Sequence, residues 1–183
     1  MIIAAFDVAT VTGVCDGAVG GSGKPRVFSW DLRDAGDGRP QRLLLFARLL
    51  RKYFTQEPVD KIVYEAPLSL AAMADIGTSE EVMLFLRGAI GVLEMTCAER
   101  AKPVASVAVQ DARESVLGWR VNRGGKKKKN ATKQRVFDEV TRLHGIAVES
   151  DNEADAYVTW AYACARENPR LALAFTPLFR ANG

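Results

Sequence analysis

The chain opens on an uninterrupted apolar run, residues 2–6, which predicts a strand buried on both faces. This run ends in an acid, Asp7, and the small and polar residues that follow it predict a tight turn. Further strands are predicted over 13–20 and 26–32, where short apolar stretches are separated by a glycine-rich segment. Because these connections are short, we expect the three strands to form an antiparallel meander.

Helical and strand patterns alternate after this meander. Apolar residues at intervals of three or four predict a helix from Pro40 to Phe54, with the proline in its first turn. A short strand over 62–64 follows, and it also ends in an acid, Glu65. The segment 68–77 is rich in small residues, and we interpret it as a long loop, either an active-site flap or a slack connection.

A second helix is predicted from a cap at Thr78 or Ser79 to about Arg100. Its apolar stripe is wider than one face requires, which indicates either a helix buried on both sides or a homodimer contact. A strand over 103–109 and a short helix over 110–117 follow. The whole pattern predicts an α/β fold with a mixed five-stranded sheet, in which three antiparallel strands precede alternating helix and strand, flanked by helices.

A concentration of basic residues precedes the last two predicted helices. Two glycines break any regular element there, and the four lysines after them are interpreted as a solvated loop or a localisation tag. Asn130 or Thr132 can cap the helix that ends at His144. Beside an acidic site, such cations would hold a phosphodiester backbone that the acids repel. The candidate DNA-binding residues are Arg120, Arg123, Lys126, Lys127, Lys128, Lys129, Lys133 and Arg135.

The last predicted helix carries a second group of acids. Asp151 or Asn152 can cap it, and Asp155 lies within about one turn of both, so all three can line one face. A capping role accounts for Asp151. It does not account for Asp155, which lies among apolar residues.

Composition narrows the possible chemistry. The 183 residues fit one domain, which we place over 1–167, followed by a C-terminal tail over 168–183. The net charge of +3 is mild, so an argument for nucleic-acid binding depends on where the basic residues lie. Three widely spaced cysteines and one histidine argue against disulfides, zinc and a Ser-His-Asp triad. No segment is apolar for long enough to span a membrane, and we expect a cytoplasmic protein.

The acids are expected to form one site. If the first and fourth strands lie side by side, Asp7 and Glu65 meet at one edge of the sheet, with the last helix packed across them. Carboxylates so close together need a counter-charge, and oxygen ligands without His or Cys favour Mg²⁺ or Mn²⁺ over zinc. Two such ions, about 3.5–4 Å apart, would activate a water and stabilise the leaving oxygen of a phosphodiester. The candidate catalytic and metal-binding residues are Asp7, Glu65, Asp151 and Asp155.

The segments FDVATVTG, VYEAP and DNEADAY, in this order and spacing, resemble the three acidic motifs of the RuvC family of Holliday junction resolvases, in the ribonuclease H-like superfamily. The likeness is greater to the divergent phage-type members than to the bacterial housekeeping enzymes. It implies a Mg²⁺-dependent homodimer, with Mn²⁺ as a possible substitute, that introduces paired nicks in four-way and other branched DNA. It also implies that Asp7, Glu65 and Asp155 are metal ligands.

The chain departs from the family pattern at three points. Valine and alanine follow Asp7, where the bacterial family commonly has proline and glycine. The residue three before Asp155 is Asn152 instead of an acid, so either Asp151 or the carbonyl oxygen of Asn152 is the fourth ligand, and we favour Asp151. The loop after the second acid offers Leu68, Leu70 and Met73 in place of an aromatic wedge, which puts a strict sequence preference at the cut in doubt.

Other functions remain compatible with the sequence. An RNA-directed nuclease of the same fold would use the same acids, and a non-catalytic branched-DNA binding module would keep them as structural caps. A phosphotransferase of the sugar-kinase or actin type shares the opening topology. It needs a second domain and a glycine-rich phosphate loop, for which the chain has no room.

Overall fold

The computed structural model describes residues 1–75, 77–119 and 126–171. Five strands form one sheet in the order β3-β2-β1-β4-β5, in which β1, β2 and β3 are antiparallel while β4 and β5 run parallel to β1. The predicted mixed sheet is therefore confirmed, including the contact between the first and fourth strands. The strands are β1 (Ile2–Asp7), β2 (Val11–Ala18), β3 (Arg26–Asp31), β4 (Lys61–Glu65) and β5 (Val104–Val107).

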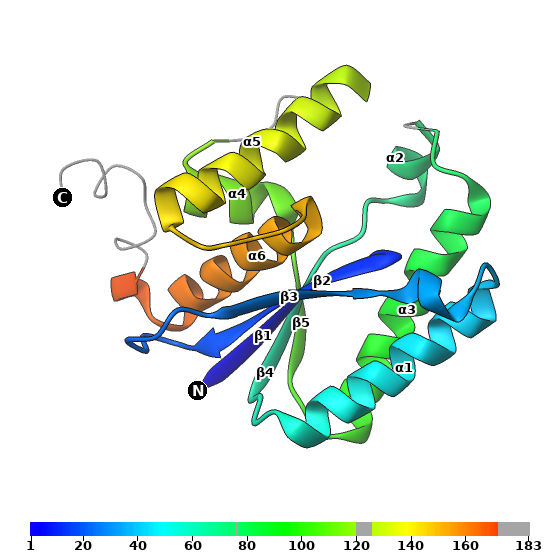
Figure 1. Ribbon diagram of the computed structural model, residues 1–183, viewed down its shortest axis with the longest axis horizontal. Coiled ribbons are helices and arrows are strands. Elements are labelled where there is room, and N and C mark those ends of the chain that lie inside the picture. Colours follow the sequence, from blue (N-terminus) through cyan, green and yellow to red (C-terminus); the bar gives the residue numbers. More distant parts are fainter. Residues whose placement is uncertain (76, 120–125, 172–183) are drawn as a thin grey trace.

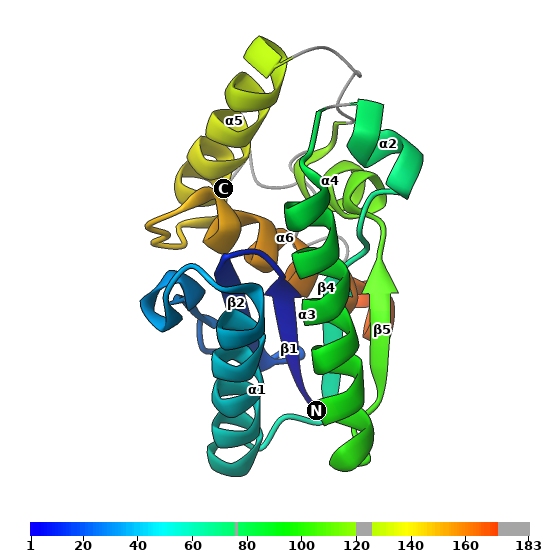
Figure 2. The ribbon, with the colours of Figure 1, turned by 90° about the vertical axis from the view of Figure 1, so that its right-hand side faces the viewer.

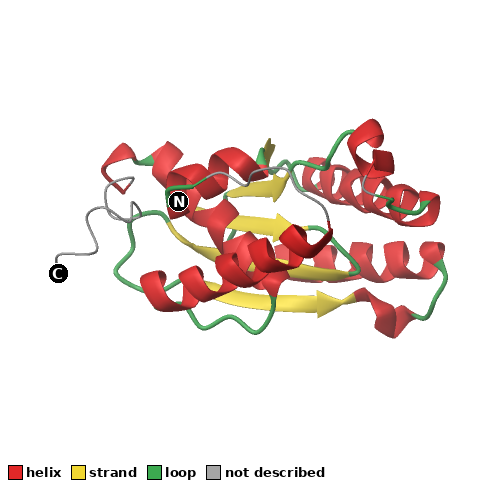
Figure 3. Cartoon of the chain, turned by 90° about the horizontal axis from the view of Figure 1, so that it is seen from above, coloured by secondary structure: helices red, strands yellow, loops and turns green. Residues whose placement is uncertain are grey.

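Helices cover both faces of the sheet (Figure 1). On one face α1 (Arg39–Gln56) and α3 (Glu80–Glu99) lie side by side, as Figure 2 shows. Three further helices lie on the other side of the sheet, and Figure 3 shows helices in front of the strands and behind them. These three are α4 (Val109–Leu117), α5 (Lys126–His144) and α6 (Asp151–Glu167).

The alternation of side chains along β1 and β4 decides where the acids point. In β1, Ile3 and Ala5 belong to the core beside α6, whereas Ala4 and Phe6 belong to the core beside α1 and α3. Because successive side chains of a strand point to opposite faces, Asp7 is directed to the α6 face. Val63 of β4 also packs in the core beside α6, so Glu65 two residues later shares that face. The sheet therefore directs both acids toward α6.

The first turn of α6 lies against β2. A Cβ atom at Gly13 of β2 would be 2.1 Å from the backbone oxygen of Asn152, so only glycine permits this approach. The side chain of Asn152 donates a hydrogen bond to the carbonyl oxygen of Val11 at 2.6 Å. Since Gly13 pairs with Asp7 across the sheet, the start of α6 is held beside the end of β1.

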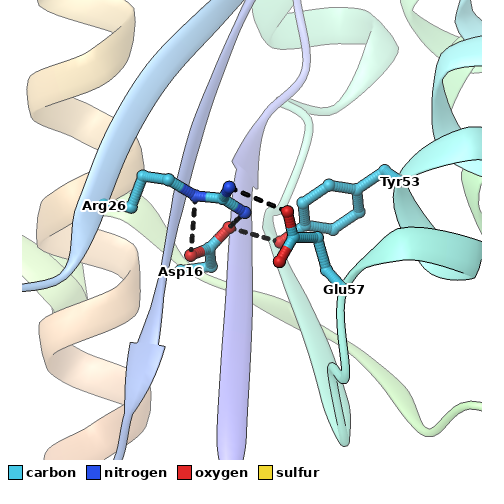
Figure 4. Close-up of polar contacts among 4 residues, drawn as sticks. All are labelled: Asp16, Arg26, Tyr53 and Glu57. Atoms are coloured by element: carbon cyan, nitrogen blue, oxygen red, sulfur yellow. Dashed lines mark hydrogen bonds and ion pairs between the residues drawn. The ribbon is translucent and has the colours of Figure 1, made fainter.

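A partly buried polar cluster ties α1 to the sheet away from the acids (Figure 4). Arg26 of β3 makes two hydrogen bonds to the carboxylate of Asp16 in β2, at 3.2 and 2.7 Å, and a third to Glu57 at 2.8 Å. The hydroxyl of Tyr53 in α1 donates to Asp16 at 2.6 Å, and desolvation raises the pKa of this tyrosine. Charged groups that are so fully paired are a structural feature of this end of the sheet.

Three predicted boundaries were wrong. The helix α5 begins at Lys126, so the lysine run lies in a helix instead of a loop, in keeping with the good helix propensity of lysine. Residues 70–75 of the predicted long loop form the short helix α2 (Leu70–Asp75). The second strand begins at Val11, two residues earlier than predicted, and the turn before it is closed by the Thr12 hydroxyl, which donates to the carbonyl oxygen of Ala9 at 2.7 Å.

The cap of α6 also differs from the prediction. Ser150, and neither Asp151 nor Asn152, is the N-cap, and its hydroxyl accepts a hydrogen bond from the backbone N–H of Glu153 at 3.2 Å. The Glu153 carboxylate in turn accepts one from the N–H of Glu149 at 2.7 Å. Ser150 thereby leaves Asp151 free of the capping role that the sequence suggested for it.

The helix α3 is buried on one side. Phe85, Ala89 and Leu93 pack in the core against α1 and the sheet, whereas Leu84 and Met95 are exposed. The interpretation that α3 is buried on both sides was therefore wrong for this chain on its own. None of the helices in the described ranges is long and apolar enough to cross a bilayer.

Candidate active site

Three acids from three elements meet at the carboxyl end of β1 and β4. Phe6 pairs with Tyr64, which brings the residues that follow them, Asp7 and Glu65, to the same end of neighbouring strands. Asp155 enters from the second turn of α6, where it is buried despite its charge. Desolvation and then the charges of Glu65 and Asp155 raise the pKa of Asp7 well above its usual value. The three acids are therefore close enough to interact electrostatically.

The electrostatics of the site oppose full ionisation of the acids. Desolvation, followed by the charge of Asp155, raises the pKa of Glu65 to about 7. Desolvation also raises the pKa of Asp155, although nearby basic groups oppose the shift. Carboxylates in this situation either take up protons or gain a cation, and the protein supplies part of that positive charge itself.

Arg113 of α4 pairs with one of the acids. Its guanidinium Nη2 donates to Asp155 Oδ1 at 2.7 Å, and both side chains are largely buried, with 11% and 8% of their surfaces exposed. The positive charge of Arg113 lowers the pKa of both Asp155 and Glu65, against the effect of desolvation. Arg113 therefore belongs to the site, although the sequence analysis did not single it out.

Lys133 of α5 is a second cation at the acids. Its ammonium donates to the carboxylate of Asp151. Desolvation lowers the pKa of Lys133, but the hydrogen bond to Asp151 and the charges of the acids raise it overall. Lys133 was predicted as a DNA-binding residue, and the structure places it at the edge of the acidic site.

Asp151 and Asn152 face different parts of the structure. Asn152 uses its amide group to bind the backbone of β2, as described above. Asp151 binds Lys133, and its charge raises the pKa of both Asp7 and Asp155. Asp151 therefore interacts with the acids through its charge, and its role as the fourth ligand stays a prediction.

The acids interact electrostatically without forming a ready-made metal site. Within the part of the chain that the structure describes, no three His, Cys, Asp or Glu side chains are grouped so that they could hold an ion. Two of the four predicted ligands are instead held by basic side chains, Asp155 by Arg113 and Asp151 by Lys133.

The other predicted DNA-binding residues divide into two groups. Arg120 and Arg123 lie outside the described residues, and Lys126 to Lys129 lie in the first turn of α5, where the side chains are outside the description as well. Arg135 is described, and its guanidinium stacks 4.1 Å from the ring centre of Trp119 and pairs with Glu139 at 2.8 Å. Trp119 also donates to Glu139, so Arg135 takes part in joining α5 to the end of α4.

The sequence contains a pattern that could have identified Arg113 as a site residue. Ala112, Val116 and Leu117 form the buried side of α4, and Arg113 lies three and four residues before the last two of them. A charged residue on the apolar side of a short helix indicates a buried partner. The pattern did not reveal that the partner is Asp155, 42 residues further along the chain.

Comparison with solved structures assigns the fold. Thermus thermophilus RuvC matches with a TM-score of 0.59 and 16% identity over 96% of this chain and 94% of its own. T. thermophilus RuvC in complex with a Holliday junction substrate matches with a TM-score of 0.63 and 16% identity, over 96% and 93%. The yeast mitochondrial Holliday junction resolvase Ydc2 matches with a TM-score of 0.56 and 14% identity, over 95% and 84%.

The chain therefore has a RuvC-like fold, as the resemblance of its motifs implied. No protein-family model matches the sequence. No curated protein matches it in sequence either. Because the identities are so low, the likeness establishes the fold, and function has to be argued from the site.

Proposed function

We propose that this protein is a metal-dependent endonuclease that resolves Holliday junctions and other branched DNA by paired nicks. The observation that carries the proposal is the meeting of Asp7, Glu65 and Asp155 at one edge of a RuvC-like sheet, where the charge of Asp155 raises the pKa of both Asp7 and Glu65. Buried acids in mutual repulsion are costly for a fold, and a site that binds cations gives a reason for them.

The donor set fits a hard divalent cation. Asp7, Glu65 and Asp155 offer carboxylate oxygens from three elements, and Asp151 adds a fourth group at the edge. Carboxylates without His or Cys suit Mg²⁺, and Mn²⁺ can take its place. When bound, one or two such ions would activate a water and stabilise the leaving oxygen in phosphodiester hydrolysis.

In this proposal the basic residues near the acids bind the DNA backbone. Lys133 places positive charge beside the carboxylates, where the phosphate of a bound strand would otherwise be repelled. The lysines in the first turn of α5 extend the positive charge along the chain toward Lys133. These cations bind the backbone without reading its sequence, as expected for an enzyme that selects branched structure.

Paired nicks need two active sites, and we propose a homodimer that supplies them. Leu84 and Met95 are exposed on α3, and Gly91 between them has no neighbouring atom within 4 Å of a built Cβ. Their spacing of seven and four residues puts the three on one face of the helix. Such an apolar face, open at a glycine, supports a close contact with a second copy.

The proposal is tested with a labelled four-way DNA junction, incubated with and without Mg²⁺ beside linear duplex and an RNA:DNA hybrid. We expect metal-dependent, symmetric nicking of the junction, which is lost in Asp155→Asn. Asp60→Asn is the matched control, because this exposed acid precedes the start of β4 at the opposite end from Glu65. Cleavage of the hybrid alone would indicate an RNA-directed nuclease, and junction binding without cleavage would indicate a binding module.

A further inference from the structure

Arg113 is a buried cation that forms an ion pair with one acid, Asp155. Its Nη2 donates to Asp155 at 2.7 Å, whereas its buried Nε has no hydrogen-bond acceptor in the described part of the chain. Burying a guanidinium is costly, and an unsatisfied buried donor adds to that cost. The fold keeps Arg113 at this position although the other buried residues of α4 are apolar.

The charges explain this placement. Four acids, Asp7, Glu65, Asp151 and Asp155, face two bases, Arg113 and Lys133, so the fully ionised set carries two uncompensated negative charges. Without Arg113 the imbalance would rise to three. Removing one partner of a buried ion pair leaves the other as an uncompensated charge, which destabilises a fold strongly. Arg113 therefore lowers the electrostatic cost of keeping Asp155 buried before any ion is bound.

We propose that Arg113 is a positioning residue that holds Asp155 in the metal-free protein and competes with the divalent ion for that carboxylate. The inference rests on the proposed function, because the ion is that of the nuclease site. The guanidinium occupies Asp155 Oδ1, and its charge repels a cation that approaches the same group. Arg113 thus stabilises the metal-free fold and weakens metal binding at the same time.

Lys133 is placed differently from Arg113. Its side chain is 38% exposed and its partner Asp151 is 36% exposed, so water can hydrate both groups when they separate. Arg113 and Asp155 have no such access, since they are 11% and 8% exposed. The competition with metal is therefore assigned to Arg113.

The first experiment measures Mg²⁺ and Mn²⁺ binding by titration calorimetry, together with melting temperatures in EDTA and in Mg²⁺. Arg113→Gln keeps a hydrogen-bond donor for Asp155 but removes the charge. We expect this variant to melt at a lower temperature in EDTA, to gain more from Mg²⁺ than the wild type, and to bind the ion on the order of tenfold more tightly.

Two variants serve as controls for the charge. Arg113→Lys retains the charge and is expected to bind metal close to the wild-type affinity. Arg51→Gln removes an exposed arginine that pairs with Glu99 on the surface, and it should leave both metal affinity and the Mg²⁺-induced stabilisation unchanged.

A second measurement uses the wild-type protein, so it can be made even if the Arg113 variants do not fold. The side-chain Nε–Hε resonance of Arg113 is followed by nitrogen-15 NMR during a Mg²⁺ titration, with that of Arg51 as the internal control. We expect the Arg113 signal to move with the midpoint of metal binding while the Arg51 signal stays in place.

The outcomes separate the two proposals. If the wild type binds neither Mg²⁺ nor Mn²⁺, the metal-dependent nuclease itself is overturned. If it binds metal but Arg113→Gln binds with equal or lower affinity, or the Arg113 resonance does not move, the competition is overturned and the proposed function stands.

Discussion

The backbone oxygen of Asn152 lies 2.1 Å from the point that a Cβ atom at Gly13 would occupy. This close approach sets α6 against β2 beside Asp7, so the absence of a side chain at Gly13 contributes to the geometry of the acidic site. The neighbouring hydrogen bond from Asn152 to Val11 holds the same contact from the helix side.

Gly13→Ala should destabilise the protein by at least about 1–3 kcal/mol, because the added methyl group meets backbone that cannot rotate away. Urea denaturation in EDTA measures the loss. Gly23→Ala is the control, since no atom lies within 4 Å of its built Cβ. Equal stability of the two variants would contradict the role assigned to Gly13.

Asp7→Asn should abolish cleavage while junction binding persists. The change removes a proposed metal ligand and leaves the basic side chains in place. Because desolvation and neighbouring acids raise the pKa of Asp7, its neutral replacement should also leave the metal-free protein at least as stable as the wild type. Gel-shift, cleavage and melting assays in EDTA check the three statements, and joint loss of binding and cleavage would count against this division.

The metal-free protein should lose stability as the pH rises from about 4.5 to about 7. Glu65 has an ordinary pKa of 4.5, and desolvation raises it to about 7 in the fold, so the folded state binds more protons than the unfolded state between these values. The contribution is fully present below the lower pKa and falls by up to about 1.4 kcal/mol per pH unit through this window. Glu65→Gln should flatten the profile measured by denaturation in EDTA, and an unchanged slope would show that another group titrates there.

Junction affinity should depend steeply on salt. If the basic segment with Lys126 to Lys129 makes about six phosphate contacts, affinity falls by about three decades between 50 and 200 mM salt. Replacing the four lysines by glutamine should reduce the slope of log affinity against log salt. Equal slopes for the wild type and this variant would remove the segment from the DNA-binding surface.

The proposed dimer should depend on the exposed face of α3. Leu84→Glu combined with Met95→Glu puts charge into that face and should convert a dimer into a monomer in sedimentation experiments. Leu68→Glu is the control, because Leu68 is also exposed but lies before α2. A wild-type protein that remains monomeric on junction DNA would contradict the proposal of two paired active sites.

Much of the fold and the acidic set follows from local patterns. The apolar run that ends in Asp7 and the short strand that ends in Glu65 predict both strands and the acid at each end. Asp155 was recognisable as an acid among apolar residues of a helix. The spacing of apolar residues, and the burial that it indicates, can be recognised within a short stretch of sequence. These features could therefore be predicted without knowledge of the rest of the chain.

The tertiary structure decided the remaining parts of the site. The pairing of Arg113 with Asp155 depends on how α4 packs against α6, and the contact of Asn152 with Val11 depends on how α6 lies on β2. The need for glycine at position 13 comes from the same packing. From the sequence alone, a glycine that serves a turn looks the same as a glycine that lets two backbones approach closely. Side chains far apart in the chain meet only after the helices dock on the sheet. The sequence alone therefore predicted the strands and the acids that follow them, and tertiary packing determined which cations hold these acids.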